Sequence, residues 1–357
     1  MSAENSDSSG RQLVHRGSEI AQGTLPQYLH GRRQIIDAGI SAFINRHYEG
    51  EILDVVRYAT ERGKRLRGIL AILICEALGG SMGDALPAAV AVELAHAASL
   101  AHDDLMDADA QRRGRPSLHV RYGTAIAVLI PHMVVPHAIL SAQVYGPQAI
   151  STIVEGWACV VGGQVRDYLT PDLYPCATNA DGDYARQFGS GGSLEGEYLQ
   201  IVHDKTSALF ETAAVLGAMA AHDLECTLLA RAYAGQLGTA FQIADDISDL
   251  LASLQQPWSA LFGSGSRRAG RGMYVLREIV AREEDEVITV DAVARAKQLV
   301  SESVDLSQEH AAKFPCSPLR ALLFDFAAVA VDQIYAEAPY PDRQSQHIEC
   351  NQASDER

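Results

Sequence analysis

The chain has 357 residues, of which 47% are hydrophobic and 21% charged, an ordinary composition for a globular protein with a sizeable core. Its formal charge of −16 argues against a general nucleic-acid-binding protein, because affinity for a polyphosphate backbone needs a basic stripe. Aromatic residues make up only 6% of the chain, whereas alanine and leucine are plentiful, and this balance favours helices over a β-sandwich.

The helical pattern occupies most of the chain. Residues 1–24 are polar and lack the apolar segment of a signal peptide, so we expect a disordered N-terminal tail. Residues 25–338 read as successive amphipathic or wholly apolar helices, and residues 88–101 are typical of a helix buried inside a bundle. Polar residues return at 339–357. We therefore predict one all-α domain between two tails.

Two polar segments interrupt this pattern. Residues 170–196 are rich in Gly, Pro, Asp and Asn, and residues 255–272 in Gly, Ser and Arg, so both are predicted to be long loops. The most apolar run, residues 125–135, is broken by Pro131 and is shorter than the ~18 residues of a membrane span, so we expect no transmembrane segment. Six scattered cysteines without a CxxC pair predict reduced thiols and a cytoplasmic protein.

The most informative pattern is Asp-Asp-x-x-Asp, which occurs twice, each time after an apolar stretch, as Asp103, Asp104 and Asp107 and as Asp245, Asp246 and Asp249. On a helix the first and last Asp of each set lie one turn apart on the same face. Such hard oxygen ligands suit Mg2+. Either set alone could be a solvated acidic surface, but two identical patterns, each at the end of an apolar helix, favour a metal site.

These segments resemble the two aspartate-rich motifs of the trans-type polyprenyl diphosphate synthases, the family of the farnesyl and geranylgeranyl diphosphate synthases. The resemblance extends over residues 63–276 and includes the stretches RGKRLRG (62–68), RRGRP (112–116), HDKTSAL (203–209) and GQLGTAFQ (235–242). It implies a single large helical bundle of the isoprenoid synthase type with a central cavity, and a homodimer. It also implies a prenyltransferase that condenses isopentenyl diphosphate head-to-tail with an allylic diphosphate to give a longer trans-polyprenyl diphosphate.

The resemblance implies a role for each matching residue. About three Mg2+ ions would bridge the aspartates and the allylic diphosphate and help it to ionise, with Asp103, Asp107 and Asp245 as main ligands and Asp104 and Asp249 in support. The residues expected to be catalytic are Asp103, Asp104, Asp107, Lys205 and Asp245. The allylic diphosphate would contact Arg112, Lys205, Thr206 and Gln242. The pocket for isopentenyl diphosphate would consist of Lys64, Arg67, His96 and Arg113.

The residues of this second pocket also have ordinary interpretations. Lys64 and Arg67 are three apart and would share a helical face, as at any basic helix start. His96 could be a hydrogen-bonded core residue, and the pair Arg112-Arg113 could neutralise nearby aspartates. Their joint order and spacing favour an anion pocket, in which the arginine fork suits phosphate oxygens.

Three departures from the family pattern stand out. Pro131 and Pro136 replace a helical Gly-Asp segment and are expected to kink or break that helix. The usual lysine after the second aspartate motif is missing, and Arg267, Arg268 or Arg271 could supply its charge. The loop at 170–196 is also longer than expected.

The sequence leaves alternatives open for the product length and for the type of reaction. Ser99 and Ala98, four and five residues before Asp103, are small, and in the family this predicts a long product, here geranylgeranyl diphosphate or longer. The alternative function is a class I terpene cyclase on the same fold, which has no use for an isopentenyl diphosphate pocket; the segments near Pro131 and Ser264 favour it. A non-catalytic partner subunit is disfavoured because both aspartate clusters are complete.

Overall fold

The structure, a computed structural model, describes residues 24–173, 194–253 and 290–337. Within these residues it is helical apart from two short paired strands, which confirms the predicted all-α fold. The elements are α2 (Leu25–His47), α3 (Gly50–Thr60), α4 (Leu66–Ala77), α5 (Met82–Met106), β1 (Gln111–Arg112), β2 (Arg115–Pro116), α6 (Leu118–Tyr122), α7 (Thr124–Ala142), the 3-10 turn η1 (Gln143–Tyr145), α8 (Pro147–Leu173), α10 (Leu194–Val202), the π-helical turn η2 (His203–Ser207), α11 (Ala208–Ala220), α12 (Thr227–Ser253), α15 (Val290–Ala312) and α16 (Arg320–Glu337).

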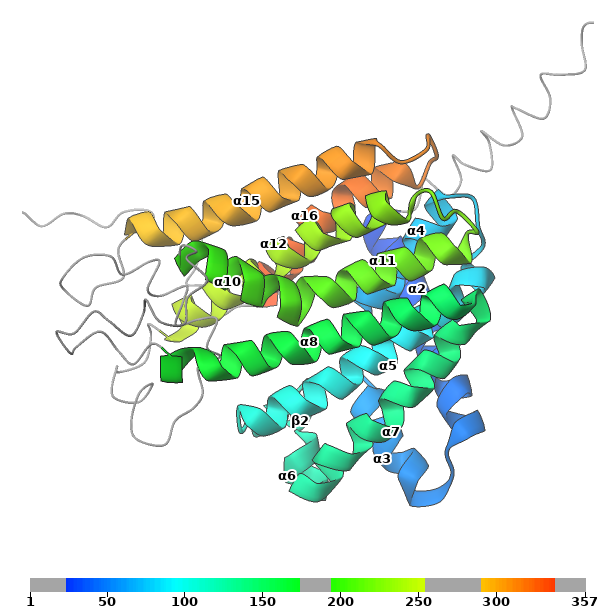
Figure 1. Cartoon of the computed structure of the whole chain (residues 1–357), viewed down its shortest axis with the longest axis vertical. Helices are drawn as coiled ribbons and strands as arrows, with labels where there is room; N and C mark the ends of the chain where they lie inside the picture. Colours follow the sequence, from blue (N-terminus) through cyan, green and yellow to red (C-terminus); the bar gives the residue numbers. More distant parts are fainter. Residues whose placement is uncertain (1–23, 174–193, 254–289, 338–357) are drawn as a thin grey trace, which may run out of the picture.

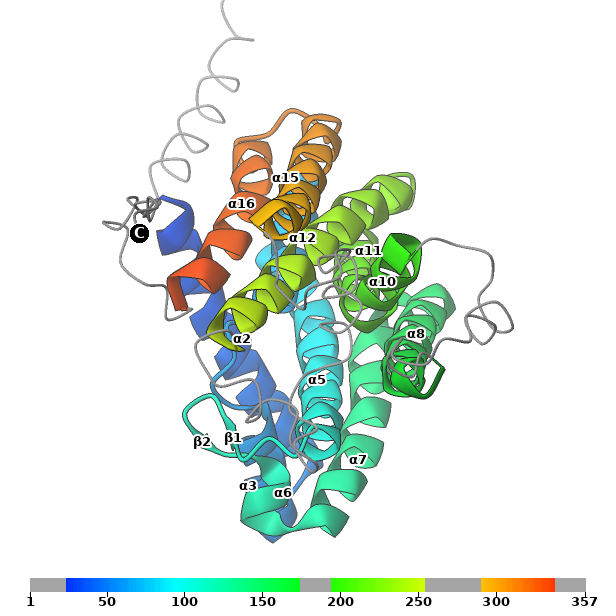
Figure 2. The ribbon, with the colours of Figure 1, turned by 90° about the vertical axis from the view of Figure 1, so that its left-hand side faces the viewer.

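The long helices lie side by side (Figures 1 and 2), and α4, α5 and α11 all contact one another. Every residue of α11 is buried, and so is every residue of α4 except Glu76. The two helices approach closely at Gly217, where a Cβ atom would lie 2.4 Å from the carbonyl oxygen of Ala71. Because only glycine fits there, this contact fixes how α11 lies against α4.

Helix α5 carries the first aspartate cluster and confirms the predicted buried helix. It begins at Ser81, whose side chain accepts a hydrogen bond from the backbone of Asp84 while the Asp84 side chain bonds back, a capping box that satisfies two backbone donors. Its middle is buried on almost all sides, mostly through alanine. Asp107 is the residue that caps its C-terminal end.

A second, smaller core lies beside the main one. It consists of apolar side chains from α10, α12, α15 and α16, among them Tyr198, Ile243 and Ile334. Since α12 contributes to both cores, the helix with the second aspartate cluster is held on two sides.

Helix α7 was predicted to be kinked or broken at its prolines, and the break does not occur, because the helix continues through Pro131 and Pro136. A proline inside a helix removes one hydrogen bond and crowds the carbonyl four residues earlier. Here the surrounding turns pack against α5 and bury Ile130, Val134 and Ala138. This burial maintains the helix despite the two prolines.

Two described helices are long and apolar enough to span a membrane by length and composition, Met82–Met106 and Thr124–Tyr145, with mean hydropathy of 1.2 and 1.8. The expectation that the apolar run near Pro131 is too short is therefore wrong. The two helices differ in how much of their most apolar segment is buried inside the protein: 67% in the first and 44% in the second. The first is a core helix, whereas the second exposes much of its apolar surface.

Some predictions fall partly or wholly outside the described residues. Helix α8 extends to Leu173 and α10 begins at Leu194, so both ends of the predicted loop 170–196 are helical. Residues 174–193, the whole predicted loop 255–272 with its arginines, and most of both predicted tails lie outside the described ranges. The four described cysteines, Cys75, Cys159, Cys226 and Cys316, are free thiols.

Candidate active site

A cavity of about 1180 Å³ is lined by residues from the aspartate-bearing ends of α5 and α12 and from α8. These helix ends lie at the same end of the bundle (Figure 1). Carboxylates, cations and apolar side chains all contribute to the cavity wall. The two aspartate clusters, 142 residues apart in the chain, thus face one space.

In the first cluster, Asp103 and Asp107 line the cavity. Burial, which removes water from the carboxylate, is the larger cause that raises the pKa of Asp107 to about 7, and repulsion from Asp103 is the second. One oxygen of Asp103, Oδ1, is buried without a hydrogen bond, although Lys205 Nζ lies 3.4 Å away. These carboxylates are crowded together with too few donors around them.

The second cluster lines the same cavity from α12, through Asp245, Asp246 and Asp249. Asp246 accepts hydrogen bonds from Tyr198 Oη at 2.6 Å and Gln242 Nε2 at 2.9 Å. The loss of water raises the pKa of Asp246 to about 7 and, with repulsion from Asp245, that of Asp249 to about 6. Tyr198 and Gln242 thereby fix the orientation of the middle carboxylate.

This donor set fits divalent magnesium. All of the crowded ligand groups are carboxylates, the hard oxygen donors that Mg2+ prefers, and the buried Asp103 Oδ1 has no donor of its own. A divalent cation between the clusters would also offset the repulsion that raises their pKa values. Asp103, Asp107, Asp245 and Asp249 all line the cavity and could hold it.

Asp104 lies differently from the other aspartates. Its side chain is buried away from the main cavity and borders a small separate one, together with Arg112. The Arg112 guanidinium lies 2.5 Å from Asp104 Oδ1 and also contacts Asp109 at 3.3 Å. Asp104 therefore orients Arg112, which does line the main cavity, and its geometry is that of a positioning residue rather than a metal ligand.

Arg112 and Arg113 reach the cavity from a small hairpin that the sequence did not predict. Strands β1 and β2 pair antiparallel, with Arg112 opposite Arg115. The two turn residues, Arg113 and Gly114, have φ of +54° and +72°, as the commonest two-residue hairpin turn requires. The signal that could have revealed it is the glycine in RRGRP.

A group of cations lines another part of the cavity, formed by Lys64, Arg67 and Arg113 with His96 among them. His96 Nε2 lies 3.3 Å from Arg67 Nη1, and burial followed by the charge of Arg67 lowers the pKa of His96 well below its usual value. Burial also lowers the pKa of Arg67 to about 10, and its Nε has no hydrogen-bond partner. Such crowded, partly unsatisfied cations fit an anionic ligand.

The expectation that Lys64 and Arg67 share a helical face is wrong, because α4 begins only at Leu66. The intervening Arg65 has φ of +62°, and its side chain turns into the core towards Asp37 at 2.7 Å and Glu93 at 3.4 Å. Glu93 also accepts the backbone N–H of Gly68 at 2.9 Å. The buried Arg65 thus shapes the turn that presents both cations.

Lys205 lies in the π-helical turn η2, between the two aspartate clusters. Its Nζ is 3.4 Å from Asp103 and 3.1 Å from Asp167. Burial alone would lower the pKa of Lys205, but these carboxylates outweigh it and raise the pKa. The turn is approached closely by Gly163 and Gly238, where a Cβ atom would lie 2.5 Å from Lys205 N and 2.5 Å from Ser207 Cα.

Asp167 is a buried part of this site that sequence reasoning missed. Its Oδ2 contacts Lys205, while its Oδ1 is buried without a hydrogen-bond partner. The signal was a lone acidic residue three positions after the GGQ of residues 162–164. Thr206, a predicted contact residue, donates to Gln242 at 2.5 Å, so these two line the cavity as a pair.

A family model described as polyprenyl synthetase matches residues 49–257. The chain belongs to the polyprenyl synthetase family. The predicted family is thus confirmed, and the match includes both aspartate clusters and the cationic turn before α4.

Among curated relatives of this polyprenyl synthetase is a dimethylallyltranstransferase of Fischerella ambigua, 34% identical over 65% of this chain and 66% of the relative. A geranylgeranyl diphosphate synthase of Cyanophora paradoxa is 34% identical over 63% of this chain and 74% of the relative. A hexaprenyl pyrophosphate synthase of Saccharolobus solfataricus is 32% identical over 60% and 68%. The aligned part therefore spans about two thirds to three quarters of these relatives.

Solved structures show the same fold. The geranylgeranyl pyrophosphate synthetase of Pyrococcus horikoshii aligns with a TM-score of 0.70 and 24% identity, covering 86% of this chain and 98% of that one. A polyprenyl synthase of Caulobacter crescentus, complexed with calcium and isoprenyl diphosphate, aligns with a TM-score of 0.64 and 23% identity, covering 87% and 98%. The helical bundle is thus that of the isoprenoid synthases.

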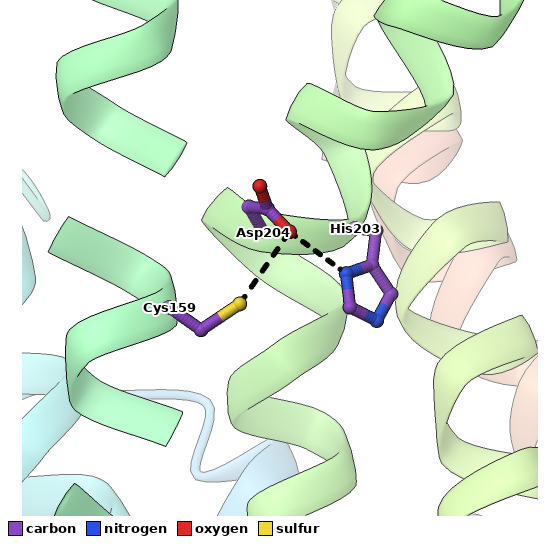
Figure 3. Close-up of side chains that lie close together, drawn as sticks. All are labelled: Cys159, His203 and Asp204. Carbon is purple, nitrogen blue, oxygen red and sulfur yellow. Dashed lines mark hydrogen bonds and ion pairs between the residues drawn. The ribbon is translucent and has the colours of Figure 1, made fainter. Parts of the chain in front are cut away.

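Next to Lys205, this polyprenyl synthetase has a cluster of Cys159, His203 and Asp204, whose side chains point towards one another (Figure 3). Their ligand-type atoms all lie within 4.8 Å of one another. His203 Nδ1 contacts Asp204 at 3.0 Å and its Nε2 contacts Glu211 at 3.1 Å. The hydrogen bond to Glu211, above all, raises the pKa of His203 to about 9.

Both carboxylates that contact His203 also have arginine partners, Arg166 at 3.3 Å from Asp204 and Arg231 at 3.2 Å from Glu211. Because charge and hydrogen bonds are balanced here by protein groups, no cation is needed. We therefore interpret the cluster as a protonated imidazole that joins the two carboxylates and supports the turn before Lys205.

Proposed function

We propose that this polyprenyl synthetase condenses isopentenyl diphosphate head-to-tail with an allylic diphosphate and releases a longer trans-polyprenyl diphosphate. The observation that carries the proposal is one cavity with two crowded carboxylate clusters and a separate group of cations. The carboxylates suit a diphosphate bound through Mg2+, and the cations suit a second diphosphate bound directly. A product of geranylgeranyl length or longer is supported by the names of the relatives.

We assign the roles of the residues by their charge: carboxylates to Mg2+ and cations to the diphosphates. Mg2+, when bound, would draw electron density from the leaving diphosphate and help the carbon–oxygen bond to ionise. Lys205 and Arg112 line the cavity beside Asp103 and Asp104, where they would bind the released diphosphate. Lys64, Arg67 and Arg113 would hold isopentenyl diphosphate so that its double bond faces the allylic carbon.

Apolar residues form the remaining wall, including Leu209 and Phe241. They would surround the hydrocarbon tail and keep water from the allylic cation, so that the double bond of the second substrate is the nucleophile that reacts. A cyclase needs no second diphosphate pocket, and the cation group around Arg67 therefore supports elongation over cyclisation.

We also propose that the protein acts as a homodimer in the cytoplasm. Large apolar side chains are exposed along α7, η1 and α8, namely Val128, Leu129, Leu140, Val144, Ile150 and Val154. These three elements contact one another, and large apolar side chains exposed on neighbouring elements are costly in water and typical of a protein interface. A second copy of the chain, related by a two-fold axis, would cover it with the same surface.

The test is to incubate the full-length protein with Mg2+, isopentenyl diphosphate and each of dimethylallyl, geranyl and farnesyl diphosphate, and to identify the products by mass spectrometry. We expect longer linear diphosphates, whose formation is abolished by EDTA and falls at least about 100-fold in Asp103→Ala. A hydrocarbon or terpene alcohol that forms without isopentenyl diphosphate would contradict elongation and favour the cyclase.

A further inference from the structure

We propose that Tyr58 and Arg115 act as positioning residues that fix where Arg112 and Arg113 meet the two diphosphates. Tyr58 lies on α3 and Arg115 on strand β2 of the hairpin, and neither of them lines the main cavity. The contacts that Tyr58 and Arg115 make with each other, with Glu61 and with the hairpin are called the hairpin clasp below. The inference rests on the proposed elongation activity, because it concerns how the substrates of that reaction are held.

The hairpin is poorly suited to hold its own shape. Each strand has two residues, and an isolated two-stranded hairpin is at best marginally stable in water. Pro116, which lies opposite Gln111, has no N–H to donate across the pair. Arg113 has φ of +54°, which residues other than glycine seldom adopt, and Arg112 lies opposite Arg115, where like charges repel. The hairpin therefore depends on contacts with the rest of the protein.

Helix α3 and the residue that follows it supply such contacts. Tyr58 Oη donates a hydrogen bond to the carbonyl oxygen of Pro116 at 2.6 Å. The Arg115 guanidinium lies 3.8 Å from the centre of the Tyr58 ring, whose face attracts a cation, and it also donates to the backbone carbonyl of Tyr58. Arg115 Nη1 is 3.2 Å from Glu61 Oε2. The hairpin clasp thus holds β2 through both its backbone and its side chain.

The same support reaches the cation group of the cavity. Arg113 Nη1 donates to the carbonyl oxygen of Glu61 at 2.8 Å, so the residue that binds Arg115 also binds Arg113. A second cavity, of about 30 Å³, is lined by residues from α3, α5 and the hairpin. Because this space is not filled by side chains, the hairpin has room to shift when the clasp is lost. Arg112 and Arg113 would then shift together, since both belong to the hairpin.

The first experiment measures kcat and KM for both substrates in wild type and Arg115→Gln. We expect the KM for isopentenyl diphosphate and the KM for the allylic diphosphate to rise about 10-fold each, while kcat changes less than about 2-fold. Arg115→Lys keeps the charge but loses the planar fork, and Tyr58→Phe loses only the hydrogen bond to Pro116, so both should show smaller increases in KM.

The matched control for these variants is Arg57→Gln. Arg57 lies on the same helix as Tyr58, is 39% exposed and forms an ion pair with Asp54 instead of contacting the hairpin. We expect this variant to keep the wild-type KM values. Unchanged KM values in folded Arg115→Gln overturn the proposal.

The second experiment is a double-mutant cycle, which separates positioning from a general loss of structure. If Arg115 acts through Arg113, its removal has little left to change once Arg113 is gone. We expect Arg115→Gln to raise the KM for isopentenyl diphosphate less than about 2-fold in an Arg113→Gln background. A rise as large as in wild type would mean that Arg115 does not act through Arg113, and it would overturn the positioning role.

Calorimetry with isopentenyl diphosphate alone needs no turnover and separates this proposal from the elongation activity. We expect Arg115→Gln to bind isopentenyl diphosphate more weakly than wild type. If wild type gives no elongated product, elongation is refuted, yet weaker binding by Arg115→Gln still supports the clasp. If wild type elongates and both proteins bind equally well, only the clasp is refuted. If Arg115→Gln fails to fold, Arg115→Lys and Tyr58→Phe decide by the same measurements.

Discussion

The buried pair Arg65 and Glu93 offers a sharp test of how the cationic part of the cavity is held in place. The two side chains are 2% and 1% exposed, and their charged atoms are 3.4 Å apart. Glu93 also accepts the backbone N–H of Gly68, at the start of the helix that presents Arg67. Replacing Glu93 by Ala would leave a buried guanidinium without this counter-charge and a buried N–H without its acceptor.

The expected loss of stability follows from this environment. Removing one partner of a buried ion pair costs about 3–5 kcal/mol, because the remaining charge stays buried. Glu93→Gln keeps an oxygen for Gly68 N–H and should cost less, about 1–3 kcal/mol. Asp37, the second partner of Arg65, is 44% exposed, so Asp37→Asn should cost only about 0–1 kcal/mol.

Urea unfolding, followed by circular dichroism, measures these differences in the free energy of unfolding. The comparison holds if the variants share the same dependence of that free energy on urea concentration. The Glu93 variants should also raise the KM for isopentenyl diphosphate more than that for the allylic diphosphate, because the turn with Lys64 loses its support. If Glu93→Ala costs no more than Asp37→Asn, the pair does not hold the turn, and the reasoning is wrong.

Two further predictions concern charge and assembly. The pKa of His203 in the folded state is raised to about 9. The protonated imidazole therefore stabilises the fold fully below pH ~6.5, and this stabilisation is lost as pH rises through about 9. Because the side chain is 41% exposed, the stabilisation is about 1 kcal/mol. Chemical denaturation of wild type and His203→Gln across this range should show the stability gap closing, and a pH-independent gap would argue against a protonated imidazole. Leu129, 55% exposed on α7, should lie in the proposed dimer interface, so Leu129→Glu should shift the mass in sedimentation equilibrium from dimer towards monomer while the exposed Glu155→Ala leaves it unchanged. A wild-type monomer, or a Leu129→Glu dimer of unchanged affinity, would contradict this.

The fold and the two aspartate clusters that line the cavity could be predicted because their signals are local. Apolar periodicity identifies α5, and the Asp-x-x-x-Asp spacing within a helix places Asp103 and Asp107 one turn apart whatever the rest of the chain does. The family resemblance then linked the second cluster to the first. These inferences needed no knowledge of distant packing.

The remaining features depend on contacts between distant segments. Local propensity predicted a kink or a break at Pro131, but the packing of α7 on α5 keeps the helix continuous. The turn at Lys64 is not helical because Arg65 is drawn to Glu93, 28 residues away. Asp167 gains its role only from the approach of Lys205 across a close glycine contact, which no spacing rule in a single sequence reveals.

The π-helical turn η2 affects how two parts of the cavity wall, near Asp246 and near Arg67, are oriented relative to each other. A π turn holds one residue more than an α-helical turn, so the helices before and after it differ in rotational phase by about 100°. Before the turn, α10 directs Tyr198 at Asp246; after it, α11 places the Phe210 ring 4.3 Å beneath the Arg67 guanidinium. The extra residue therefore sets the angle between the contacts made at Asp246 and those made at Arg67. Deleting it would rotate one set of contacts relative to the other without replacing any ligand.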